Sequence, residues 1–160
     1  MGFFSRSDPK VPPLVPIPPI ADLPPAKLQA SARYLGTFDP DGVRVVGQSL
    51  SARSAARLSL SAEALDVVRI AGSFRIVPEA LRGAKTANQF GGKPVTDLLI
   101  VRWTHAGNEW ESGFRLDAAR SVRDAAKAQL GKGKSTTQPE VGAWVRTLSK
   151  LARESSGGNA

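Results

Sequence analysis

The hairpin signal at residues 96–117 constrains the fold of this chain more than any other feature of its sequence. Leu98–Val101 is a continuous apolar run, which is typical of a strand buried on both faces. Turn residues His-Ala-Gly-Asn follow at 105–108, and the next segment alternates between side-chain types as a half-buried strand does. The residues of that second strand expected to point inward are Trp110, Ser112 and Phe114.

A helical pattern begins directly after this hairpin. Asp117 is suited to a helix N-cap, and Gly131 to the residue that stops the helix. A hairpin that runs straight into a helix predicts a small antiparallel sheet or barrel closed by its last helix. We therefore expect a scaffold for binding rather than for catalysis.

Shorter strand signals from Arg33 onward extend the same architecture. Leu58 and Leu60 alternate with polar residues, and Phe74 and Ile76 are expected to face the core. Asp39-Pro40-Asp41-Gly42 marks a turn, and Phe90-Gly91-Gly92-Lys93-Pro94 is expected to be loop or bulge. Together with the hairpin, these signals predict a mainly β (α+β) antiparallel barrel of about seven strands, capped by a helix, over residues 31–130.

Residues 131–160 predict a basic linker at 131–138, an amphipathic helix at 139–153 and a disordered tail at 154–160. The residues from Thr137 to Glu140 have the spacing of a capping box, which opens a helix. The apolar face of this extra helix is expected to consist of Val141, Trp144, Val145, Leu148 and Leu151.

Residues 1–30 form a proline-rich arm, because residues 9–25 hold eight of the twelve prolines in the chain. Proline fixes φ and lacks a backbone donor, so this segment is expected to be extended rather than helical. Two interpretations remain open at this stage. The arm is either a stiff linker or tail, or a segment docked on the domain or on a partner through its Val, Leu and Ile side chains.

The formal net charge of the chain is +8, which favours anionic partners, but residues 118–160 alone carry +5 of it. The chain has no cysteine, which excludes disulfides and thiolate chemistry, and no apolar run long enough to span a bilayer. No secretory signal is evident in the first residues. We therefore expect a cytoplasmic location, with the inner face of the membrane as an open alternative.

Two groups of residues are candidates for contact with a partner or a lipid. The first is a loop in which basic side chains accompany an aromatic ring: Arg82, Lys85, Phe90 and Lys93. Its alternative is a glycine-rich connection whose Phe90 folds inward, and it lacks the ending of a phosphate-binding loop. The second group is the basic C-terminal region: Lys132, Lys134, Trp144, Arg146 and Lys150. Here the alternative is that Trp144 packs onto the barrel.

Catalytic and metal sites are not predicted. His105 is the only histidine and falls at the hairpin turn, and one histidine cannot supply a metal cluster. Glu109 and Glu111 share one face of a strand, where glutamates near arginines are usually just solvated. We therefore expect no enzyme activity and no cofactor.

Several short motifs, in order and spacing, resemble the pleckstrin-homology-like domain of small actinobacterial proteins that are often labelled transporter or export proteins. The matching pieces lie within residues 31–130 and are Tyr34–Thr37, Ser49–Ala56, Leu58–Ser61, Phe90–Lys93 and the stretch from Trp103 through Ser112–Arg115. The resemblance implies a non-catalytic barrel. A membrane-spanning helix commonly precedes the domain in that family, and here the proline-rich arm takes its place.

We therefore expect a non-enzymatic binding or scaffold module that acts through protein–protein contacts. Two alternatives stay open, a peripheral protein that binds anionic lipid and a small basic barrel that binds nucleic acid. The sequence identifies neither the partner nor the oligomeric state.

Overall fold

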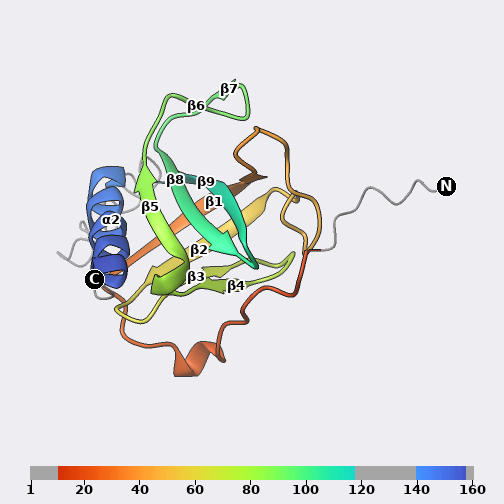
Figure 1. The fold of residues 1–160 in the computed structure, drawn as a ribbon. Coiled ribbons are helices and arrows are strands. Elements are labelled where there is room, and N and C mark those ends of the chain that lie inside the picture. The colour runs from red at the N-terminus through yellow and green to blue at the C-terminus, as the bar shows by residue number, and fades with distance from the viewer. Residues whose placement is uncertain (1–10, 118–139, 158–160) are drawn as a thin grey trace, which may run out of the picture.

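The computed structural model describes residues 11–117 and 140–157, and its centre is one antiparallel sheet of seven strands (Figure 1). The order of strands across the sheet is β4-β3-β2-β1-β9-β8-β5. These strands are β1 (Leu28–Phe38), β2 (Ser54–Leu60), β3 (Leu65–Val68), β4 (Phe74–Ile76), β5 (Leu81–Lys85), β8 (Leu98–His105) and β9 (Asn108–Leu116).

The predicted mainly β architecture and the number of strands are confirmed, but the sheet is not closed into a barrel. Strands β4 and β5 are its two edges, and a short connection that contains the 3-10 turn Pro78–Ala80 leads from one edge to the other. The predicted capping helix between Asp117 and Gly131 falls on residues outside the described part of the chain, as does the predicted linker at 131–138. Among the described residues, the helix that covers the sheet is α2 (Val141–Gly157).

The β8–β9 hairpin forms where the sequence predicted it, with Trp103 opposite Trp110 and His105 opposite Asn108. Its two central residues, Ala106 and Gly107, have φ of 51° and 83°. Positive φ at both positions is what a type I′ turn requires, and this turn matches the twist of the two strands. Leu98–Val101 is buried throughout, as predicted for a strand covered on both faces.

Helix α2 lies beside β5 and covers the main core (Figure 1). Trp144 and Leu148 are fully buried, and Ala152 is 6% exposed. The helix continues to Gly157, so residues 154–157, assigned above to a disordered tail, are helical. Trp144 is thus a core residue rather than a surface contact, which corrects its place among the candidate contact residues.

A chain of buried hydrogen bonds crosses the sheet from β8 to the loop before β2. The Trp103 indole donates to the Ser112 hydroxyl over 2.9 Å, and the Ser112 and Thr37 hydroxyls are 2.6 Å apart. Thr37 in turn contacts the Tyr34 hydroxyl, which donates to the Leu50 carbonyl. The Tyr34 hydroxyl has one proton, and it donates that proton to the Leu50 carbonyl. The Thr37 hydroxyl must therefore donate to the Tyr34 oxygen, and the Ser112 hydroxyl to the Thr37 oxygen. All four side chains therefore have defined donor and acceptor roles.

Arg69 connects the turn after β3 to the same loop. Its side chain is buried, and the residue is only 5% exposed. Its guanidinium donates to the carbonyls of Gly72 at 2.6 Å and Ser49 at 2.9 Å. It also lies over the Tyr34 ring, 4.5 Å from the centroid. Burial lowers the pKa of Arg69, but the carbonyls and the ring replace the water that the cation loses.

The described part of the proline-rich arm lies against the domain. The Val15 carbonyl accepts the backbone N–H of Arg75 on edge strand β4 over 2.8 Å, and Gln48 donates to the Val11 carbonyl over 3.2 Å. Val11 and Leu14 pack against the core. A short 3-10 turn, Ile20–Asp22, interrupts the otherwise extended arm at positions that are not proline. Strand β1 then begins at Leu28, five residues before the first predicted strand residue.

Replacing Trp144 with alanine should reduce the free energy of unfolding by about 3–5 kcal/mol, because the indole is fully buried in the core. The exposed neighbour Arg146, replaced with alanine, should change it by no more than about 0.5 kcal/mol. Urea denaturation of both variants tests the difference. Equal, small effects would contradict the packing of α2 on the sheet.

Burial raises the pKa of Tyr34 from 10.0 to about 12. Because the folded-state pKa is the higher one, the folded state favours the neutral phenol. This contribution, about 3 kcal/mol, is complete below pH ~10 and should be lost as the pH rises toward ~12. Tyr34 is the only tyrosine, so tyrosinate absorbance reports it alone. The alkaline loss of stability should be smaller in Tyr34→Phe, and an equal loss would contradict this assignment.

Candidate functional site

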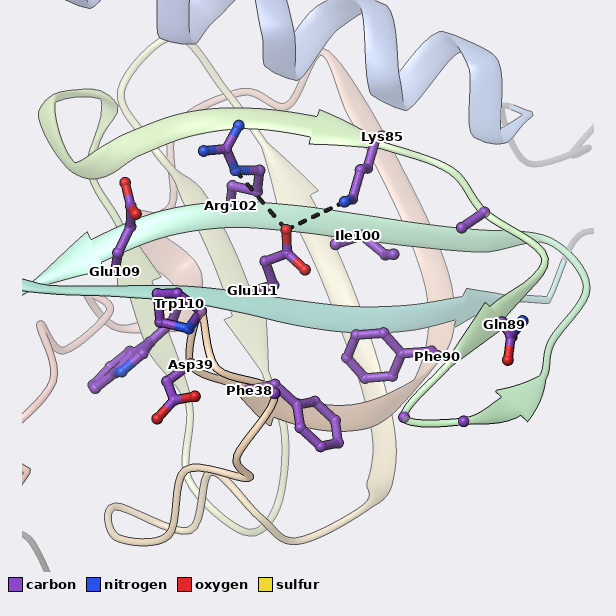
Figure 2. Close-up of a pocket in the computed structure, with 15 residues that line it drawn as sticks. Phe38, Asp39, Lys85, Gln89, Phe90, Ile100, Arg102, Glu109, Trp110 and Glu111 are labelled. Carbon is purple, nitrogen blue, oxygen red and sulfur yellow. Dashed lines mark ion pairs between the residues drawn. The ribbon is translucent and has the colours of Figure 1, made fainter.

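A small hairpin between β5 and β8 folds back over the outer face of the large sheet (Figure 2). It consists of β6 (Gln89–Phe90) and β7 (Lys93–Pro94), in a segment that the sequence analysis assigned to loop or bulge. Gly91 and Gly92 form its turn with φ of 59° and 81°, a conformation that glycine adopts without strain. The two glycines therefore let the chain reverse, rather than prevent pairing.

Phe90 anchors this hairpin by lying over Gly113 of β9. A Cβ atom added at Gly113 would come within 2.7 Å of the Phe90 ring, so the ring occupies the space that any other residue would fill. Phe90 is 9% exposed and packs with Leu35, Leu98 and Ile100 in a second, smaller core. Of the two interpretations of Phe90 above, the inward one describes the structure.

On one side of Phe90 lies a groove of about 720 Å³, called here the aromatic groove (Figure 2). Phe38 and Phe90 meet edge to face in it, with centroids 5.1 Å apart, and Trp110 and Ile100 also line it. Five charged residues surround these apolar side chains: Asp39, Lys85, Arg102, Glu109 and Glu111.

The charges of the aromatic groove largely neutralise one another. The Glu111 carboxylate lies 3.3 Å from the Lys85 ammonium and 3.9 Å from the Arg102 guanidinium, and Figure 2 shows it pointing between them. The side chains of these three residues are 36–52% exposed, so the ion pairs contribute little to stability. Their consequence is for recognition: both cations have the same carboxylate beside them, so neither lies in the groove without a counter-charge nearby.

On the other side of Phe90 lies a second groove of about 600 Å³, called here the basic groove. Phe90 and Ala87 line both grooves, so the two adjoin at the hairpin. The basic groove contains one carboxylate, Asp97, against four cations: Arg33, Arg53, Lys93 and Arg115.

The predicted contact residues do not form one site. Lys85 lies in the aromatic groove and Lys93 in the basic groove, while Arg82 lines a third hollow between β5 and α2. Arg146 and Lys150 are exposed on α2, and Lys132 and Lys134 fall outside the described residues. The groove residues that were not among the candidates include Phe38, Arg33, Arg53 and Arg115.

The pairing of strands explains why these residues were missed. Arg33 and Arg115 are 82 positions apart in the sequence, and only the β1–β9 register places them opposite each other. The outward alternation of charged residues in the second hairpin strand was a usable signal for Arg115. No local signal indicated that Phe38 would meet Phe90.

Several titratable side chains in the described part of the chain form structural contacts rather than a metal site. Residues 11–117 and 140–157 contain no group of three histidine or carboxylate side chains placed to hold a metal ion. His105 ends β8 and its Nε2 lies 3.2 Å from the Pro12 carbonyl, a contact with the arm. Asp66 and Arg75 form an ion pair at 2.7 Å, which raises the pKa of the arginine and joins β3 to β4.

The geometry is thus that of an open antiparallel sheet with a helix packed beside β5 over the main core and two adjoining grooves at the β6–β7 hairpin. The model of the bacterial PH domain-like family matches residues 11–130, three quarters of the chain. The chain therefore belongs to the bacterial PH domain-like family. A comparison with curated proteins gives no match. The matched range begins at Val11, so it includes the docked arm.

Domains of this family are generally non-catalytic modules for binding. Neither the partner nor a membrane contact follows from the family alone. Among the helices that the structure describes, none is long and apolar enough to cross a membrane.

Replacing Gly113 with alanine should reduce the free energy of unfolding by about 1–3 kcal/mol, because the new methyl group collides with Phe90. Phe90→Ala removes the ring and the collision together. The double variant should therefore lose less stability than the sum of the two single variants, by more than about 0.5 kcal/mol. A double-mutant cycle by urea denaturation measures this coupling. Strict additivity would show that the ring does not lie over Gly113.

Proposed function

We propose that this protein is a non-enzymatic binding module that holds a segment of a partner protein in the aromatic groove. The observation that supports this proposal is an apolar surface formed by Phe38, Phe90 and Trp110 inside a rim of mixed charge, in which Lys85 and Arg102 share Glu111. Aromatic side chains surrounded by a polar rim are typical of protein–protein contact surfaces. The proposed working compartment is the cytoplasm, which includes the inner face of the membrane.

The charge balance of the groove favours a protein segment over the other two candidate ligands. Three carboxylates and two cations line it, so an anionic lipid surface or a nucleic acid would meet repulsion as well as attraction. A peptide can place an apolar side chain against the rings and polar groups against the rim. Phe38 is the accessible ring, since it is half-buried whereas Phe90 and Trp110 are buried.

A direct test uses peptides that are selected from a random display library for binding to the full chain. Replacing Phe38 with alanine should raise the dissociation constant of the selected peptides at least about tenfold, a loss of about 1.4 kcal/mol, because the anchoring ring is removed. Isothermal titration calorimetry measures the constant for each variant.

Two further variants make this test specific. Gln89→Trp places a bulky ring in the groove from an exposed position of β6 and should weaken the same peptides. Arg57→Ala, exposed on β2 and outside both grooves, should leave their affinity unchanged. If the peptides bind Phe38→Ala and Gln89→Trp as tightly as the unaltered chain, the aromatic groove is not the binding site. Sedimentation with anionic vesicles that Lys85→Glu abolishes would instead support the lipid alternative.

A further inference from the structure

The basic groove carries a concentration of like charge that the fold itself does not neutralise. Arg33 of β1 and Arg115 of β9 are Cα partners in adjacent strands. Arg53 reaches the same groove from the loop residue that precedes β2, and Lys93 from the β6–β7 hairpin. Like charges directly opposite each other destabilise an antiparallel pair, so this arrangement has a cost for the unliganded protein.

Three cations elsewhere in the sheet are paired with carboxylates, whereas the basic groove gathers several cations around a single carboxylate. Arg75 lies 2.7 Å from Asp66, and Lys85 and Arg102 share Glu111. Within residues 11–117 and 140–157, no carboxylate makes an ion pair with Arg33, Arg53 or Arg115. Asp97 lines the groove without reaching any of them to within ion-pair distance.

We propose that the basic groove receives the carboxylates of an acidic protein segment. This proposal rests on the proposed function, since it adds a charge requirement to the partner of the aromatic groove. The two grooves adjoin at Phe90 and Ala87, so one extended chain can place an apolar side chain in the first groove and acidic side chains in the second. Arginine suits this task because its planar guanidinium binds a carboxylate through two parallel hydrogen bonds.

The surroundings of the basic groove favour a peptide over an anionic membrane. A flat anionic surface placed over Arg33 and Arg115 would also approach the adjoining groove, whose carboxylates include Glu109 and Glu111. A peptide avoids this repulsion because its charge can be confined to one part of its length. Leu35 and Val95 also line the basic groove. In the proposed complex their apolar side chains contact the peptide backbone or the methylene groups of the acidic side chains.

Titration of the isotope-labelled full chain with an oligoglutamate peptide at low ionic strength tests this proposal, with oligoglutamine as the uncharged probe. Oligoglutamate should shift the backbone amide resonances around Arg33, Arg53, Lys93 and Arg115, and oligoglutamine should not. Raising the salt concentration should weaken the effect, as expected for charge pairing.

Arg115→Glu is the decisive variant, because the new carboxylate faces Arg33 and replaces repulsion by attraction. It should melt no lower than the unaltered chain, so that a loss of binding is not a loss of folding. It should weaken oligoglutamate at least about tenfold. Arg57→Glu, the same charge change at an exposed position of β2 outside the groove, should weaken it by less than about threefold.

Several results would overturn the proposal. These are an absence of shifts, shifts spread evenly over the surface, or equal weakening by Arg57→Glu and Arg115→Glu. Pelleting with phosphatidylserine vesicles that Arg115→Glu abolishes, in the absence of oligoglutamate shifts, would assign the groove to a membrane instead. Phe38→Ala leaves the basic groove intact and should not change oligoglutamate binding, so this test and the test of the aromatic groove fail independently.

Discussion

The contact between Phe90 and Gly113 organises the outer face of this domain. Strand β9 has no side chain at position 113, and the ring of Phe90 fills that space from the β6–β7 hairpin, beside which Val95 packs on the same cluster. Everything that can be called a site follows from this contact, because the hairpin divides one exposed sheet face into two grooves. The glycine is needed for the absence of a side chain rather than for unusual backbone geometry.

The inner face of the sheet depends on a different constraint: the buried polar groups there must form hydrogen bonds with one another. Trp103, Ser112, Thr37 and Tyr34 pass hydrogen bonds in one direction toward the Leu50 carbonyl, and Arg69 holds carbonyls of the same loop. Buried polar groups are costly when unpaired, so this network stabilises one arrangement of the long β1–β2 loop. The arm covers edge strand β4. The Val15 carbonyl accepts the backbone N–H of Arg75, which an open edge would expose.

The distribution of charge is more informative than its sum. The net charge of +8 suggests a protein with a general affinity for polyanions. In the fold, the aromatic groove is close to balanced and the basic groove has an excess of cations, only a few residues away. This separation is what connects the two proposals, since it describes a partner whose own apolar and acidic parts are adjacent in its sequence.

Local pattern determined much of this structure. Alternation with a period of two identified the inward residues of β2, β4 and β9, from Leu58 to Phe114, because each depends only on which face of its own strand is buried, but it did not identify β6 and β7. The amphipathic stripe likewise identified α2, although not its end at Gly157. The tertiary structure alone decided that the sheet stays open, that Phe90 lies over Gly113, and that Arg33 faces Arg115. These are pairings between distant parts of the chain, and they depend on strand register. The residues next to a position in the sequence do not determine which distant residue will lie opposite it.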